Sequence, residues 1–77
     1  MLSHQPPFSD AYFGQAGFTD VDLRGAIFRN ANFIEGDFTN TDLSYADLSG
    51  AKNLDGYKNV ICYETIMPDS SIYTGHI

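Results

Sequence analysis

The chain carries one large apolar residue at every fifth position over more than half of its length. From residue 8 to residue 48 each of these positions is Phe or Leu, in the order Phe8, Phe13, Phe18, Leu23, Phe28, Phe33, Phe38, Leu43, Leu48. A second column of mostly small residues lies two positions earlier, in the order Pro6, Ala11, Ala16, Val21, Ala26, Ala31, Gly36, Thr41, Ala46. The other three positions of the five-residue unit are mostly polar.

A period of five matches neither of the two common secondary structures. Five residues advance a helix by ~500°, which scatters the column around the helix, and in a strand they alternate between the two faces. Within one unit, however, the small residue and the Phe or Leu are two apart, so a short extended segment points both to the same side. The chain must then turn once per unit with its apolar residues inside, which predicts a solenoid.

Units such as Val21–Gly25, Ala31–Glu35 and Ala46–Gly50 resemble the A(D/N)LXX consensus of the pentapeptide-repeat family. The resemblance implies an all-β fold: a right-handed quadrilateral β-helix (solenoid) of about two to three coils with a C-terminal cap. Four units per coil imply that residues 20 apart stack. The expected stacks are Phe8 on Phe28 and Leu48, Phe13 on Phe33, Phe18 on Phe38, and Leu23 on Leu43.

The sequence predicts one domain with three parts. Residues 1–7 are a polar lead, in which Pro6 and Pro7 are suited to guard a sheet edge because neither has an N–H. Residues 8–56 form the β-helix, and Leu54 stands one place late in the apolar column. We expect this one-residue insertion to end regular stacking. Residues 57–77 form the C-terminal cap and tail, since their apolar residues lose the five-residue step and would cover the open core.

The stretch Ile61–Ile72 resembles the C-terminal tail, roughly C-x-T-x-M-P-D-G-S-I, of cyanobacterial and thylakoid-lumen members of the family. Some of those relatives carry a second cysteine near the end, and His76 stands at about that place here. The resemblance therefore implies that no cap disulfide forms. Cys62 is expected to be a small, buried apolar residue.

Composition removes several classes of function. The 77 residues include ten acidic and four basic side chains, and the net charge of −6 argues against nucleic acid or an anionic membrane as a direct partner. One cysteine and two histidines exclude an internal disulfide and a structural zinc site. No apolar run reaches the ~18 residues of a membrane span, and the N-terminus lacks a secretory signal. We therefore expect a cytoplasmic protein, or a lumenal one if the chain is a processed form.

The outward position before each Phe or Leu becomes acidic toward the C-terminal half, which gives one candidate surface. The expected outer acidic face consists of Glu35, Asp37, Asp42 and Asp47. Such a face could dock a basic protein surface; in the simpler interpretation these carboxylates solvate the solenoid and bond to turn backbone. Stacking also makes Asp22 a vertical neighbour of Asp42, a mildly unfavourable like-charge pair.

We predict no catalytic, cofactor-binding or metal-binding residue and no cofactor. Cys62 and His76 could be imagined as nucleophile and base, but no G-x-C context or ordering carboxylate accompanies them. His76 is expected in a frayed end. Arg24 and Arg29 lie amid the acids and are expected to neutralise local charge at the surface.

Two function hypotheses follow. The first is a noncatalytic structural or protein-interaction module with no small-molecule substrate, which binds another protein or self-associates through its acidic face or an open coil end. Two of the outward apolar residues Ile27, Ile34 and Tyr45 on one face would mark the contact. The second, suggested by some family members, is a DNA mimic that acts on a topoisomerase such as gyrase. At β spacing two to three coils span only ~10–15 Å, so mimicry needs an end-to-end dimer.

The inward column gives a first test by substitution. Phe13→Asp should abolish folding, because a carboxylate inside the solenoid has neither water nor a partner. Thr39→Asp, at an outward position, should leave the fold nearly unchanged. Far-UV circular dichroism of both variants checks the register, and an equal loss of signal in the two would contradict it.

Overall fold

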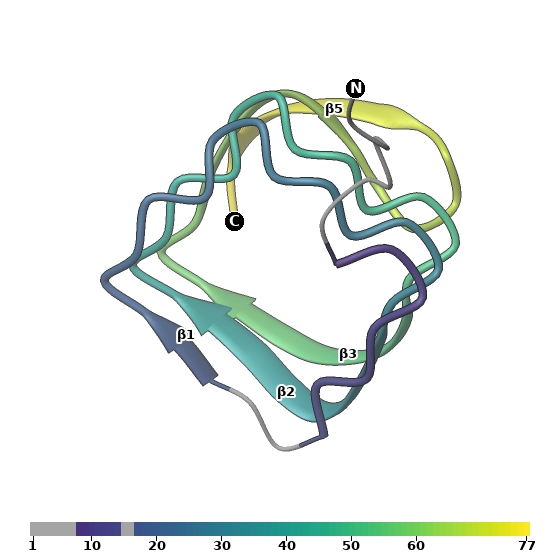
Figure 1. Ribbon diagram of the computed structural model, residues 1–77. Coiled ribbons are helices and arrows are strands. Elements are labelled where there is room, and N and C mark those ends of the chain that lie inside the picture. Colours follow the sequence, from purple (N-terminus) through teal and green to yellow (C-terminus); the bar gives the residue numbers. More distant parts are fainter. Residues whose placement is uncertain (1–7, 15–16) are drawn as a thin grey trace, which may run out of the picture.

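A computed structural model describes residues 8–14 and 17–77, and Figure 1 looks along the axis of the coil. The strands are β1 (Gly17–Thr19), β2 (Asn32–Thr39), β3 (Lys52–Lys58), β4 (Ile61–Ile66) and β5 (Ile72–His76). β1, β2 and β3 form a parallel sheet along one side of a four-sided coil, and β5 turns back antiparallel on β4.

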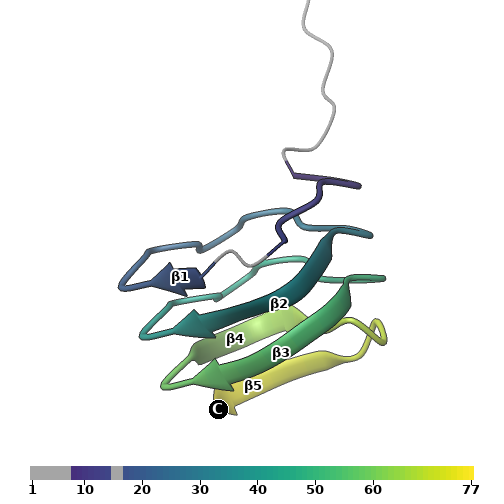
Figure 2. The ribbon, with the colours of Figure 1, turned by 90° about the horizontal axis from the view of Figure 1, so that it is seen from below.

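The expected all-β fold, a right-handed quadrilateral β-helix, is confirmed. Its coils lie one above the other in the side view of Figure 2, with β5 at the C-terminal end of the stack. No helix in the described ranges is long and apolar enough to cross a membrane. The lead with Pro6 and Pro7, for which we expect an edge-guarding role, lies outside the described residues.

Aromatic rings fill the bore of the coil in layers. Three pairs stack ring over ring with centroids 5.2, 5.2 and 5.4 Å apart: Phe8 on Phe28, Phe13 on Phe33, and Phe18 on Phe38. Rings within one layer meet edge to face, as Phe28 and Phe33 do at 5.3 Å. Each such pair contributes about 0.5–1.5 kcal/mol beyond the burial of area. Phe28 and Phe33 are completely buried, whereas Phe8 in the first layer is 46% exposed.

The backbone confirms the stacking of residues 20 apart. Parallel bridges at this spacing join Tyr12 to Asn32, Asp22 to Asp42, and Ile27 to Asp47. β1 pairs with β2 at the same spacing. Hydrogen bonds run between the coils, for example from the Leu23 N–H to the Asp42 carbonyl at 2.9 Å. Each unit thus pairs in parallel with the unit 20 residues further along the chain, on the next coil.

The third coil is one residue shorter than the second, which corrects our interpretation of the break at Leu54. Lys52 pairs with Asn32 and Tyr57 pairs with Phe38, so the four residues 53–56 face the five residues 33–37. Beyond this point the partners are 19 apart, as in the bridges Asp42–Ile61 and Asp47–Ile66. The break is a deletion with an irregular pairing rather than an insertion, and it does not end the stacking.

The five-residue step also continues, displaced by one place, through Tyr57, Cys62 and Met67. The Tyr57 ring stacks on Phe38 with centroids 6.1 Å apart, and Cys62 is 3% exposed. Our expectation that the step is lost after residue 56 is therefore wrong. The position at which we place the start of the cap falls within β3, and the division of the chain into three parts stays a prediction.

One residue per unit makes the corner with a left-handed backbone. Positive φ angles between 52° and 63° occur at Asp20, Asn30, Glu35, Asn40 and Tyr45, and Gly25 and Gly50 have φ of 74° and 73°. A turn hydrogen bond closes the corner, as from the Ala26 N–H to the Leu23 carbonyl at 3.0 Å. A type II turn has this pattern, since its third residue requires positive φ. Gly, Asn and Asp adopt that conformation at least cost.

Substitution of Gly25 tests the backbone conformation of a corner separately from side-chain crowding. A Cβ added at Gly25 would meet no atom within 4 Å, yet φ there is +74°. Gly25→Ala should therefore destabilise the fold by about 1–2 kcal/mol through backbone strain alone. In a chain of this size the melting temperature should fall by about 4–8 °C for each kcal/mol.

Gly56→Ala is the matched control, because a Cβ there also meets nothing within 4 Å and the backbone is not in the left-handed region. Thermal unfolding followed by circular dichroism compares the two variants. Equal melting temperatures would contradict the proposed role of the corner residue.

Candidate interaction surface

The four predicted acidic residues do not form one face. β2 carries Glu35 and Asp37. Asp42 belongs to a ladder of three residues, Asp22, Asp42 and Ile61, which we call the Asp42 ladder. Asp47 belongs to another, Ile27, Asp47 and Ile66, which we call the Asp47 ladder. Because each ladder connects the coils at a different unit, the carboxylates are distributed over several sides of the coil and do not combine into one docking surface.

Two of the four carboxylates bond to the turn that follows them. Oδ1 of Asp42 accepts hydrogen bonds from the Ser44 N–H at 3.0 Å and from the Ser44 hydroxyl at 2.7 Å. Oδ1 of Asp47 accepts from the Ser49 N–H at 3.0 Å, and Asp22 makes the same kind of bond. Asp at this position satisfies a backbone donor of the corner. The geometry of these two residues favours the structural interpretation of the acidic positions.

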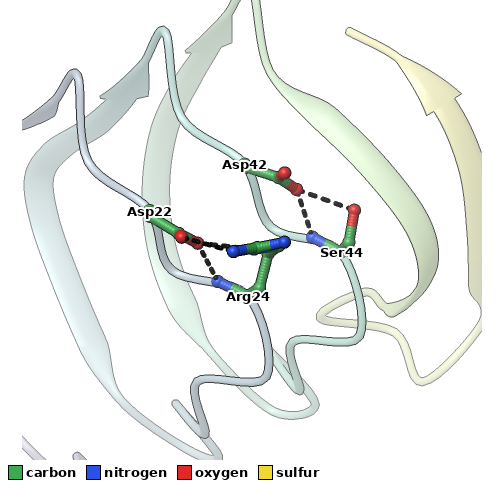
Figure 3. A network of polar contacts seen from close by, with 4 residues as sticks. All are labelled: Asp22, Arg24, Asp42 and Ser44. Carbon is green, nitrogen blue, oxygen red and sulfur yellow. Dashed lines mark hydrogen bonds and ion pairs between the residues drawn. The ribbon is translucent and has the colours of Figure 1, made fainter.

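Arginine side chains lie against the stacked carboxylates, as the sequence predicts. Figure 3 shows Arg24 beside Asp22, with Asp42 on the next coil. Arg24 donates to Asp22 from Nε at 3.0 Å and from Nη2 at 2.9 Å. These side-chain bonds lower the pKa of Asp22 and raise the pKa of Arg24. Nε of Arg29 lies 3.6 Å from Oδ2 of Asp47.

A shallow groove of about 480 Å³ runs along the Asp42 ladder. Its charged lining residues are Asp20, Asp22, Arg24 and Asp42, and the last three have the partners given above. Within residues 8–14 and 17–77, no group of three or more His, Cys, Asp or Glu could hold a metal ion. Three of the four charged groups of this groove therefore already bond to one another or to the turn.

Cys62 and His76 lie on neighbouring strands but on opposite faces of their sheet. Cys62 pairs with Gly75, the residue before His76, and successive side chains of a strand point to opposite faces. Cys62 is buried and His76 is exposed. Burial raises the pKa of the Cys62 thiol, which favours the unreactive protonated form. His76 belongs to β5, so the expectation of a frayed end is wrong.

Exposed apolar side chains gather on the last two strands instead. Nine large apolar side chains are exposed in the described part of the chain. Six of them belong to β4 or β5, directly follow β5, or pack on β4: Tyr45, Ile61, Tyr63, Ile72, Tyr73 and Ile77. The Tyr45 and Tyr63 rings meet edge to face at 5.4 Å. Tyr73 and Ile77 lie on the same face of β5 as Gly75, the partner of the buried Cys62. We call the other four residues, Tyr45, Ile61, Tyr63 and Ile72, the C-terminal surface.

Sequence reasoning missed this surface because it assigned the segment to a buried cap. The available signal was the continued step of Tyr57, Cys62 and Met67, which makes Cys62 inward and its neighbours Ile61 and Tyr63 outward. Of the outward apolar residues named from the sequence, Tyr45 belongs to the C-terminal surface. The other two do not, since Ile34 lies on β2 and Ile27 on the Asp47 ladder.

Comparison with known proteins gives one match. The family model described as pentapeptide repeats matches residues 8–44 and 16–52, with eight copies. These ranges cover more than half of the chain and coincide with the first two coils and the start of the third. No curated protein and no solved structure matches the chain.

Two substitutions of Asp42 distinguish its role as a hydrogen-bond acceptor in the turn from the effect of its charge. Asp42→Ala should destabilise the fold by about 1–2 kcal/mol, because it leaves the N–H and hydroxyl of the nearly buried Ser44 without their acceptor. Asp42→Asn keeps an acceptor oxygen and removes a charge next to Asp22, so its stability should stay close to that of the native chain. Chemical denaturation measures both. A loss in the Asn variant as large as in the Ala variant would contradict the turn-bonding role.

Proposed function

The chain belongs to the pentapeptide-repeat family, and from this we propose that it is a noncatalytic β-helix module whose role is to contact another protein, either a different chain or a second copy. Family membership supports a structural or protein-interaction module in general terms. The proposal adds where the contact is made. We assign it to the C-terminal surface rather than to the acidic residues, which the coil separates.

The concentration of exposed apolar side chains is the observation that carries this assignment. In the first two coils the large apolar residues at every fifth position point into the bore, and the ladders between the corners carry mostly polar groups. On β4, Ile61 and Tyr63 are 44% and 47% exposed, and Tyr45 beside them is 59% exposed. Clustered apolar residues in water favour a partner contact, and tyrosine is enriched at the centres of such contacts.

The second candidate is mimicry of DNA on a topoisomerase. The net charge of −6 is the observation in its favour. Its requirement is length, because three coils at ~4.8 Å spacing span only about 10–15 Å. Mimicry therefore depends on an end-to-end pair of chains. A gyrase supercoiling assay without inhibition at micromolar protein would eliminate it.

The assignment of the contact to the C-terminal surface is tested by site-specific photo-crosslinking. A benzophenone side chain in place of Tyr63 should form adducts with protein in the cells that make this chain, and excess unlabelled chain should compete with them. The same side chain in place of Tyr12, which is 70% exposed on another ladder, is the control. The adduct yield should be several-fold higher at position 63. Equal yields at the two positions, or none at either, would overturn the assignment.

A further inference from the structure

β5 has a free edge at the C-terminal end of the stack (Figure 2). In the described part of the chain it pairs with β4 and with no other strand. Val60 and Ile77 exchange both of their backbone hydrogen bonds, at 3.0 and 2.9 Å. Because such pairs alternate along an antiparallel ladder, the N–H and C=O groups of Thr74 and His76 point away from β4. The His76 carbonyl accepts a long bond of 3.3 Å from the Tyr73 hydroxyl.

This edge lacks the features that prevent strands from pairing with other chains. Natural edge strands carry charged residues, above all lysine, or proline. β5 has the sequence Ile-Tyr-Thr-Gly-His, which contains no Asp, Glu, Lys, Arg or Pro. β3, one of the two edge strands of the parallel sheet, begins with Lys52 and ends with Lys58, both exposed. The two edges therefore differ in whether a second strand can approach.

Charge and apolar exposure favour a second copy as that strand. A chain with net charge −6 repels its own copies, yet the stretch 70–77 contains no Asp, Glu, Lys or Arg. Two copies can thus meet along β5 with little electrostatic cost. Exposed apolar side chains lie on and next to β5: Ile72, Tyr73 and Ile77 are 68%, 37% and 38% exposed. A strand that pairs antiparallel with its own copy also satisfies two-fold symmetry, the usual symmetry of dimers.

We propose that this chain forms a homodimer in which β5 pairs antiparallel with β5 of a second copy. The register centred on Thr74 places the edge-facing backbone groups of Thr74 opposite each other and those of His76 opposite Ile72 of the other copy. The result is a continuous four-stranded sheet, β4-β5-β5-β4, that joins two coils through their C-terminal ends. This inference rests on the proposed function and specifies both the partner and the contact.

The dimer should be weak. A five-residue edge with three part-exposed apolar side chains offers less than the ~800 Å² per partner of a standard stable interface. Sedimentation equilibrium should therefore show a monomer–dimer equilibrium with a dissociation constant in the micromolar range or weaker. Hydrogen exchange should slow at the Thr74 and His76 amides as the protein concentration rises, because these groups become bonded only in the dimer.

His76→Pro and His76→Ala form a matched pair of variants. Proline removes the edge-facing N–H and is tolerated at edge positions, so His76→Pro should weaken the dimer tenfold or more. His76→Ala keeps the N–H and should retain the dimer. If His76→Pro unfolds, Ile72→Lys replaces it, with Ile34→Lys on β2 as the control for an added surface lysine. Melting curves establish that each variant is folded.

The outcomes separate this inference from the proposed function. A chain that stays monomeric up to about 1 mM overturns the β5 dimer, and the crosslinking yield at position 63 then decides on its own whether the module contacts another protein. A dimer that His76→Pro and Ile72→Lys leave intact, with no slowing of exchange at the Thr74 amide, also overturns the β5 pairing. Such a dimer would keep the proposed function and place the contact elsewhere.

Discussion

The narrow bore is the constraint on which the rest of this structure depends. Coils that pair as parallel strands lie roughly 4.7–4.9 Å apart, and stacked rings such as Phe13 and Phe33 have centroids 5.2 Å apart. The distance between coils therefore suits both the hydrogen bonds between their backbones and the stacking of their aromatic rings. The bore has room for one large residue per unit, so the other inward position is occupied by residues such as Ala31 and Ala46, which are buried. Where threonine takes this position its hydroxyl donates to a carbonyl, as Thr65 does to Leu43 at 2.7 Å.

The corners follow from the bore, because a four-sided coil requires a sharp turn after each unit. The left-handed residue at the corner is glycine or asparagine in many units, but Glu35, Tyr45 and Glu64 also adopt positive φ. Each of these three is strained by roughly 1–2 kcal/mol relative to ordinary backbone. Ladder bonds on both sides of the corner hold the conformation, as at Tyr45, whose N–H donates to the Tyr63 carbonyl at 2.8 Å. The acidic residue before the Phe or Leu adds a further bond to the turn, so much of the negative charge is part of the corner architecture.

These two requirements leave the outer surface as the place where function can differ between chains with this repeat. In the first two coils the repeat fixes the inward residues and many of the corner residues. The regular pattern changes at the third coil, where Tyr57 pairs with Phe38 one residue early. There β4 turns its apolar residues Ile61 and Tyr63 outward, and β5 adds an edge that no strand of the described chain covers. The end of the repeat is thus the part of the molecule to which we assign the proposed contact with another chain.

The sequence by itself determined the inward column, because a side-chain period of five permits only a coil with these residues inside. The spacing of 20 between Phe13 and Phe33 or Asp22 and Asp42 came from the resemblance to pentapeptide repeats, since the period alone does not distinguish a coil of four sides from one of three. The arrangement of charges along the chain placed Arg24 beside acids, and the resemblance of the C-terminal tail placed Cys62 in the core. The displaced step of Tyr57, Cys62 and Met67 is a sequence trace of the change to a spacing of 19. Only the pairing of β3 with β2 showed where the chain shortens, at residues 53–56. Tertiary structure alone decided the antiparallel return of β5 on β4 and the contact of Tyr45 with Tyr63, which arise from pairing between distant residues and leave no periodic trace in the chain.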